Sequence, residues 1–155
     1  DGEPVAYPTG PALLAGVGTQ TQHAFFQWMH QGTDDIASVF IGVDAKHHQT
    51  TSPLGKLAAE YAQDVNLCMH AQADVLWDGG ETTKAGVFGQ HGVYPGGRPV
   101  AILTLDGISP HTVGATIAAF EHAVYTAAVM WGINPFDQWG VELGKQMYAA
   151  AKKAA

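Results

Sequence analysis

Short apolar runs alternate along the chain with longer segments in which apolar residues recur at helical spacing. Three runs predict buried strands, at residues 12–18, 37–43 and 100–105. The first run opens into Gly16 and Gly18, which is typical of a strand that leads into a tight turn. The second run is rich in β-branched residues, which favour a pleated and buried strand.

Four segments predict helices, because their apolar residues return every three or four positions. We expect them over residues 21–31, 53–77, 110–132 and 139–151. Ser52-Pro53 and Ser109-Pro110 each combine an N-cap serine with proline at the first helical position.

The first helix is predicted to turn Phe25, Trp28 and Met29 toward the core. The helix after Pro110 is predicted to be a core helix, with an apolar face that consists of Val113, Ile117, Phe120, Val124 and Ala128. Residues 79–97 hold seven glycines and predict a loop.

This order of strands and helices predicts an α/β fold, a mostly parallel sheet flanked by helices. Three strands make a thin sheet for this class, and the chain begins at Asp1 instead of Met. We therefore expect residues 1–155 to form an incomplete fold that is part of a larger subunit, with apolar surface exposed at its edge.

Composition narrows the possible partners. The 155 residues include 14 acidic and 7 basic side chains, for a formal charge of −7, so a nucleic-acid partner is not expected. With 46% hydrophobic and 14% charged residues the chain is expected to fold, and no run of 18 apolar residues predicts a membrane span. The lone Cys68 excludes an internal disulfide and favours a reducing, cytoplasmic compartment.

Two loops follow predicted strands at the sheet edge where ligands bind in open parallel sheets. Residues 16–19 can present backbone amides to an anion at a helix start, or simply form a glycine turn. Residues 43–48 end in His47 and His48, which fit a general acid or base, a metal pair or a plain polar loop. The ligand spacing of known metal sites is absent from this loop.

The other six histidines favour core or surface roles, although His23 and His30 share one helical face. Gln138 and Lys145 are seven residues apart, so both can face one pocket, although physical chemistry alone favours a solvated or salt-bridged lysine at Lys145. A serine or cysteine hydrolase is disfavoured, because no Gly-x-Ser-x-Gly elbow is present and Cys68 lies within a helix.

The segment from Phe136 to Lys145 (FDQWGVELGK) resembles the carboxyl-terminal signature of the glucose-6-phosphate isomerase family. Further matches follow the family's order along the chain: Gly18-Thr19, Gln22-His23-Ala24-Phe25, Gln27, His30-Gln31-Gly32-Thr33, Gly96, Arg98-Pro99 and Glu121-His122. The chain is identified as a member of this family on these motifs.

The resemblance implies a carboxyl-terminal sugar-isomerase (SIS-type) domain with a three-layer αβα architecture. It implies interconversion of glucose 6-phosphate and fructose 6-phosphate through a cis-enediol, without metal or cofactor. His47 would assist ring opening from the neighbouring subunit of a homodimer, Lys145 would handle protons at the sugar oxygens, and Gln138 would contact the phosphate. Thr19, of the family's Gly-Thr pair, is a candidate substrate-binding residue.

The chain departs from the family where the essential base stands. The family has a glutamate two residues before the Gly-Thr pair, where this chain has Gly16. The family's amino-terminal phosphate loop and active-site arginine have no counterpart here either. A sugar-phosphate-binding or assembly module without catalysis is therefore the alternative function.

Overall fold

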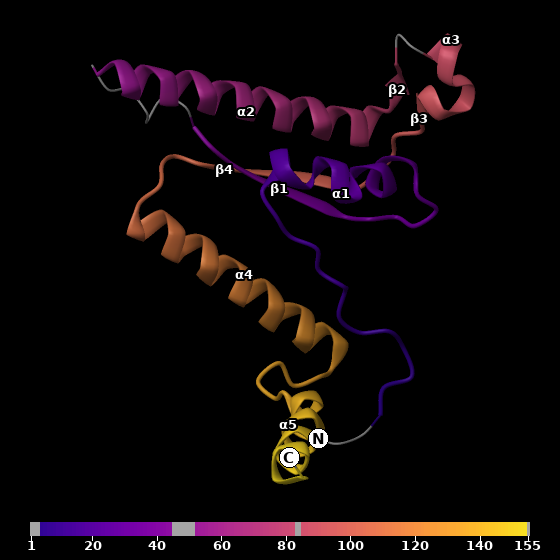
Figure 1. Cartoon of the computed structure of the whole chain (residues 1–155), viewed down its shortest axis with the longest axis vertical. Coiled ribbons are helices and arrows are strands. Elements are labelled where there is room, and N and C mark those ends of the chain that lie inside the picture. Colours follow the sequence, from indigo (N-terminus) through magenta and orange to yellow (C-terminus); the bar gives the residue numbers. More distant parts are fainter. Residues whose placement is uncertain (1–3, 45–51, 83–84, 155) are drawn as a thin grey trace. The chain divides into compact units, whose positions relative to one another are not determined.

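The computed structural model describes residues 4–44, 52–82 and 85–154, which divide into two compact units. The larger unit is Leu13–Val113, and the smaller unit combines Asp1–Ala12 with Gly114–Ala155. Figure 1 shows a strand pair with helices packed beside it in the larger unit, whereas the smaller unit is mainly helical.

The larger unit is built on two parallel strands. Strand β1 pairs with β4, with Ser38 opposite Val100 and Val43 opposite Leu105. A small antiparallel pair, β2 with β3, follows the second helix. The elements of this unit are α1 (Gly18–Gln31), β1 (Ser38–Val43), α2 (Pro53–Asp78), β2 (Gly80–Glu81), α3 (Ala85–Phe88), the 3-10 helix η2 (Gly89–Gly92), β3 (Val93–Tyr94) and β4 (Val100–Leu105).

Helix α2 begins and ends where the sequence predicts. The Ser52 hydroxyl accepts a hydrogen bond from the Gly55 amide at 3.0 Å, and Pro53 occupies the first turn. The helix ends at Gly79, whose φ of +74° suits glycine. Gly96, with φ +70°, comes so close to this helix end that an added Cβ would lie 2.7 Å from the carbonyl carbon of Asp78.

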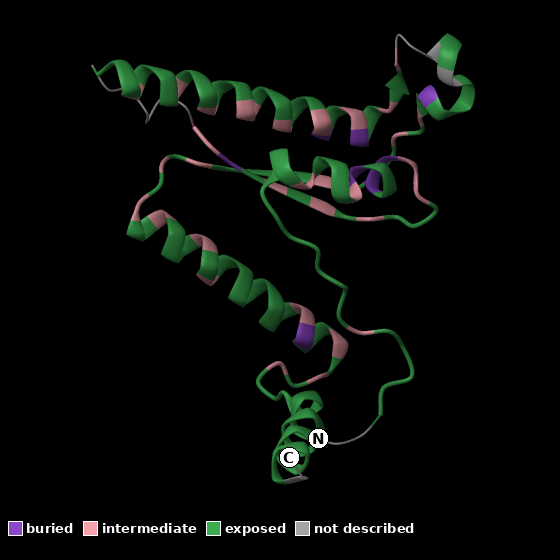
Figure 2. Ribbon diagram, in the orientation of Figure 1, coloured by how far each residue is buried: buried purple, intermediate pink, exposed green. Residues whose placement is uncertain are grey.

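The core of the larger unit lies where α1, α2 and the sheet meet. Phe26, Met29 and Leu76 are buried, and Leu76 is only 1% exposed. Phe40 of β1 meets the Phe26 ring edge-on, with the ring centroids 6.3 Å apart. Figure 2 shows that buried residues concentrate at the ends of α1 and α2 nearest the β2–β3 pair.

Arg98 joins the end of α1 to the start of β4. Its guanidinium donates to the backbone oxygens of Gly32 at 2.6 Å and Asp34 at 2.9 Å, and pairs with the Asp35 carboxylate at 3.0 Å. The Arg98 side chain is only 10% exposed. These contacts of Arg98 therefore hold the turn between α1 and β1 against the core.

The smaller unit consists of α4 (Pro110–Trp131, of which residues 110–113 belong to the larger unit), the 3-10 helix η3 (Trp139–Val141) and α5 (Glu142–Ala154). The Tyr7 hydroxyl donates to the Trp131 carbonyl at 2.5 Å, which ties the amino-terminal segment to the end of α4. Asn134 organises the turn after α4, because its amide donates to Asp137 at 2.7 Å and its oxygen accepts from the Phe136 amide.

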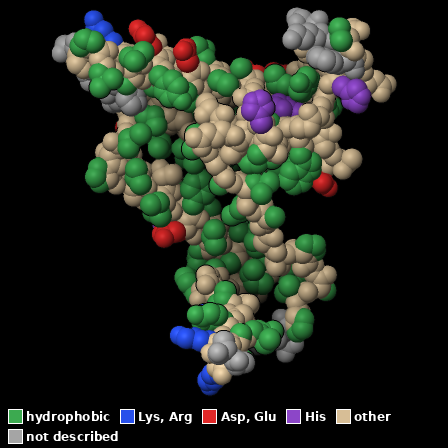
Figure 3. All heavy atoms as spheres, viewed as in Figure 1, with side chains coloured by type: hydrophobic (Ala, Val, Ile, Leu, Met, Phe, Trp, Pro, Cys, Tyr) green, Lys and Arg blue, Asp and Glu red, His purple; other side chains and the backbone are tan. Residues whose placement is uncertain are grey.

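Helix α4 forms where predicted, but its predicted core face is open. Ile117 and Val124 are 55% and 59% exposed, and Ala128 is the one buried residue among the described residues of the helix. By length and composition alone, α4 is the one described helix that could cross a membrane. Apolar side chains cover much of the face seen in Figure 3, where charged side chains are few.

The α/β class and the parallel sheet are confirmed, but three further local predictions were wrong. Residues 12–17 form no strand and are exposed, because they have no hydrogen-bonding partner strand among the described residues. Trp28 is 44% exposed, and Phe26 takes its place in the core. The predicted loop at 79–97 contains β2, α3, η2 and β3.

The predicted third layer stays a prediction, as does the treatment of residues 1–155 as one domain. Helices α1 and α2 share one core with the strands. On β1, Phe40 packs against this core, and its neighbours Val39 and Ile41, which point to the other face of the strand, are 54% and 49% exposed.

Candidate functional site

Thr19 lies in the first turn of α1 and is exposed. The helix starts without a side-chain cap, and the Val17 carbonyl accepts the amides of Gln20 and Thr21, both at 2.9 Å. Amides that precede these in a first helical turn have no partner within the helix itself. The predicted helix is confirmed but begins at Gly18, three residues before the predicted start, while a substrate role for Thr19 stays a prediction.

Gly16 stands where the resembled family has its base. A Cβ at this position would run into the methyl group of Thr21, so the backbone at residue 16 is closely packed by the first turn of α1. A larger side chain at residue 16 fits only if Thr21 turns away. The structure thus explains how glycine is accommodated here, and residue 16 itself supplies no carboxylate.

Gln138 and Lys145 lie in the smaller unit. Gln138 precedes the 3-10 helix η3, and its side chain is exposed and makes no capping hydrogen bond. The α-helix begins only at Glu142, so the eight residues from Gln138 to Lys145 do not form two regular α-helical turns. The geometric argument for a shared face, which assumed one continuous helix, was therefore wrong.

Lys145 is ion-paired, in agreement with one of the two roles that its sequence allowed. Its ammonium donates to the Glu142 carboxylate at 2.6 Å, one turn earlier on α5. The two side chains are 67% and 48% exposed, so solvent screens the pair and its contribution to stability is small. The ammonium is accessible, and Glu142 holds it toward the start of α5.

His47 lies outside the described residues, as does His48. Asp44, the last described residue before this segment, donates its amide to the Leu105 carbonyl at 2.7 Å. Asp44 thus lies at the carboxyl end of the parallel pair, as predicted. Thr19 belongs to the larger unit, and Gln138 and Lys145 belong to the smaller one.

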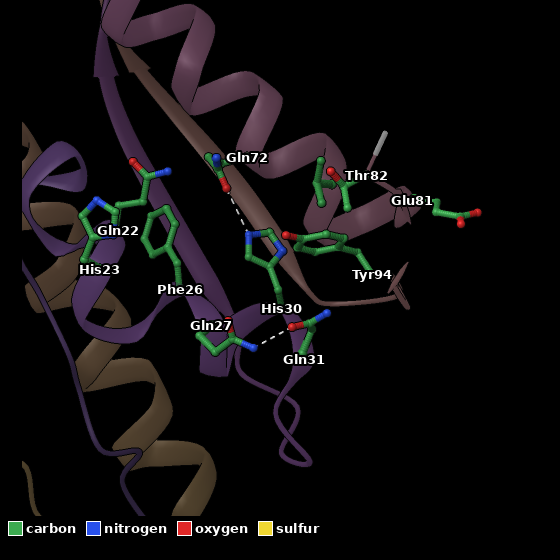
Figure 4. Close-up of a pocket in the computed structure, with 12 residues that line it drawn as sticks. Gln22, His23, Phe26, Gln27, His30, Gln31, Gln72, Glu81, Thr82 and Tyr94 are labelled. Atoms are coloured by element: carbon green, nitrogen blue, oxygen red, sulfur yellow. Dashed lines mark hydrogen bonds between the residues drawn. The ribbon is translucent and has the colours of Figure 1, made fainter. Parts of the chain in front are cut away.

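The larger unit contains a cavity of about 610 Å³ between α1, α2 and the β2–β3 pair. Figure 4 shows the side chains that point toward it, among them Gln22, His30, Gln72 and Tyr94. His30 is 7% exposed, and one of its ring nitrogens meets the Gln72 oxygen at 3.0 Å. Its ring also packs edge-on against Tyr94, with centroids 5.4 Å apart.

The sequence pattern did not predict this cavity. His23 and His30 do share one face of α1, as expected, and both line the cavity. Gln22, Gln27 and Gln31 lie along the same face, and this row of polar residues at helical spacing was the available signal. Among the described residues, no three His, Cys, Asp or Glu side chains come together to hold a metal ion.

A parallel strand pair packed against two helices defines the chain as part of an α/β protein with a crossover-connected sheet. The family model for phosphoglucose isomerase matches residues 1–155. The chain therefore belongs to the phosphoglucose isomerase family.

Relatives agree with this assignment. The chain is 40% identical over 164 residues to a glucose-6-phosphate isomerase of Methylibium petroleiphilum, a match that covers 95% of this chain and 30% of that protein. It is 41% identical over 152 residues to one from Francisella tularensis strain SCHU S4, which covers 94% and 28% respectively. The chain thus spans about 30% of the length of the curated relatives it matches.

A solved structure extends the likeness to three dimensions. The crystal structure of a glucose-6-phosphate isomerase from Chlamydia trachomatis matches with a TM-score of 0.75 and 30% sequence identity. The match covers 97% of this chain and 28% of that one. The fold described above is accordingly a part of the isomerase fold.

Proposed function

We propose that this chain is the carboxyl-terminal part of an enzyme that interconverts glucose 6-phosphate and fructose 6-phosphate. The supporting observation is the family match over residues 1–155 with the segment from Phe136 to Lys145 intact. We place the enzyme in the cytoplasm as a homodimer with a sugar phosphate substrate, in keeping with the roles that the family resemblance implies.

Lys145 is proposed to act at the sugar oxygens. An ammonium group can donate a hydrogen bond to an oxygen that gains negative charge as the ring opens. Its exposure of 67% leaves the group accessible, and Glu142 at 2.6 Å is the partner it would exchange for substrate. Gln138, just before η3, would contact the phosphate through its amide, which donates two hydrogen bonds.

His47 and Thr19 complete the proposed set. An imidazole exchanges protons near neutral pH, which suits assistance to ring opening, and we propose that His47 acts across the dimer. Thr19, at the exposed start of α1, can add a hydroxyl donor to the amides of that helix end. The reaction proceeds through a cis-enediol and uses neither metal nor cofactor in this proposal.

Proton transfer between the two sugar carbons needs a base, and Gly16 cannot supply one. We propose that a carboxylate elsewhere in the protein takes this role. The intact Phe136–Lys145 segment supports retained catalysis, because a chain that had lost its chemistry would have no need to keep this segment.

Gly16 also motivates the alternative, a module of the same fold that binds sugar phosphate without catalysis. A coupled assay on the gene product, expressed in an isomerase-deficient host, separates the two. The catalytic proposal predicts conversion of fructose 6-phosphate to glucose 6-phosphate. Saturable binding of 6-phosphogluconate in calorimetry without any turnover would refute catalysis and support the binding module.

A further inference from the structure

The described lining of the cavity between α1, α2 and the β2–β3 pair contains none of the residues Thr19, Gln138 and Lys145, which are proposed to act on substrate. Its volume of about 610 Å³ falls within the usual range of small-molecule sites. We propose that this cavity binds a small uncharged molecule that carries several hydroxyl groups, of the class of a free sugar or polyol. This inference does not rest on the proposed isomerase activity.

The charge of the described lining disfavours a phosphorylated or otherwise anionic ligand. Among the described residues that line the cavity there is no lysine or arginine, and Glu81 adds a negative charge. Glutamine is the commonest polar residue of the lining, at Gln22, Gln27, Gln31 and Gln72. An amide offers two donors and an acceptor, which matches hydroxyl groups that also both donate and accept.

The amides are held in place by a network within the cavity wall. Gln31 donates to the carbonyls of His91 at 3.0 Å and Val93 at 2.8 Å, which fixes α1 to the segment that leads into β3. Gln27, one turn earlier, donates to the Gln31 oxygen at 2.6 Å. Side chains that are already ordered lose less conformational freedom when a ligand binds.

His30 provides a buried acceptor in the same wall. Because the Gln72 oxygen can only accept, the His30 Nε2 that meets it must carry the hydrogen. In the neutral ring the other nitrogen, Nδ1, is then an acceptor, and it is buried without a hydrogen-bond partner among the described residues. A buried acceptor without a partner is destabilising, so a ligand hydroxyl that donates to Nδ1 would be favoured.

Access to Nδ1 is controlled by its aromatic neighbour. Nδ1 has no solvent contact in this structure, and the half-buried Tyr94 ring packs edge-on against the His30 ring. We expect a bound ligand to displace the Tyr94 ring. The apolar face of the ligand would then pack against this ring, a contact that aromatic side chains commonly make in binding sites. Phe26 also packs edge-on against the His30 ring and lines the cavity, so it supplies a second apolar surface.

The test uses the full chain and NMR titrations with D-glucose, sorbitol and inorganic phosphate. The proposal predicts saturable shifts of the His30 and Gln72 side-chain signals with glucose or sorbitol, and none with phosphate. Gln22→Ala removes a lining amide and should weaken binding about tenfold, the equivalent of one hydrogen bond. Gln20→Ala is the matched control, because Gln20 is exposed on α1 outside the lining.

Three results would overturn the proposal. The first is the absence of saturable shifts with either glucose or sorbitol while the spectrum still shows the folded β1–β4 pair. The second is saturable binding of phosphate at His30 and Gln72, which would contradict the uncharged ligand class. The third is equal weakening by Gln20→Ala and Gln22→Ala, since only Gln22 lines the cavity.

Discussion

Replacement of Arg98 by methionine is the sharpest test of how the larger unit is held together. The guanidinium joins three groups of the turn after α1 through hydrogen bonds of 2.6 to 3.0 Å, to Gly32, Asp34 and Asp35. Methionine keeps an apolar stem of similar length but can donate to none of them. Two backbone carbonyls then lose a charged donor in a region where the Arg98 side chain is only 10% exposed.

The expected loss follows from the two kinds of contact. A hydrogen bond from a charged donor contributes about 1.5–3 kcal/mol, and two of them go to the backbone carbonyls. The Asp35 side chain is 84% exposed, so that ion pair contributes at most about 1 kcal/mol. Removal of a buried charge offsets part of the loss. We therefore expect Arg98→Met to lower the free energy of unfolding of the larger unit by about 3 kcal/mol.

Native-state hydrogen exchange of the β1 and β4 amides measures this change within the larger unit alone. Asp35→Ala is the control, since it removes the exposed ion pair but keeps both carbonyl contacts, and it should cost about 1 kcal/mol or less. Equal effects of the two variants would refute the reasoning, because they would show that the backbone contacts of Arg98 contribute nothing measurable.

Three further changes test the core, the cap and the close glycine contact, each by urea unfolding. Leu76→Ala should cost about 3 kcal/mol, because the side chain is 1% exposed and its loss leaves a cavity; a cost under about 1 kcal/mol would contradict this packing. Ser52→Ala should cost about 1 kcal/mol through loss of the α2 cap, and an unchanged stability would show that the cap is not formed. Gly96→Ala should be more damaging than Gly97→Ala, since both have positive φ but only residue 96 would press against Asp78; equal costs would refute the close contact.

The elements predicted best from the sequence are those whose first and last residues are determined by neighbouring residues in the chain. Ser52 as the cap and Pro53 as the first helical residue predicted the start of α2, and the Ser109 hydroxyl likewise accepts the Thr112 amide at 3.1 Å at the start of α4. Apolar composition predicted β1 and β4 to within one residue. Capping hydrogen bonds and buried runs depend on neighbours in the chain, so a local pattern is sufficient to find them.

Features that depend on distant partners were not predicted. Residues 12–17 have the composition of a strand, but a strand requires a neighbour to pair with, and the described chain offers none. Composition could not reveal that Ile117 and Val124 would remain exposed, because burial depends on what packs against α4. A chain that spans about 30% of its relatives lacks most of the surfaces that those relatives contain.

The site residues that the family motif predicts, Gln138 and Lys145, stay predictions. The 3-10 turn between them altered the spacing on which the argument for their shared face depended. The cavity beside His30 is formed by residues from three elements distant in sequence, so no short motif marks it. The His30–Gln72 contact, 42 residues apart, is an example that only the fold reveals.

The central claim is that this chain carries Lys145 as a catalytic residue of a sugar phosphate isomerase. The most direct measurement compares Lys145→Ala with Lys152→Ala in the full-length gene product, by the coupled assay from fructose 6-phosphate. Both lysines are exposed on α5, so neither change should unfold the protein. We predict that Lys145→Ala abolishes turnover while Lys152→Ala retains it. Full activity of Lys145→Ala would contradict the account.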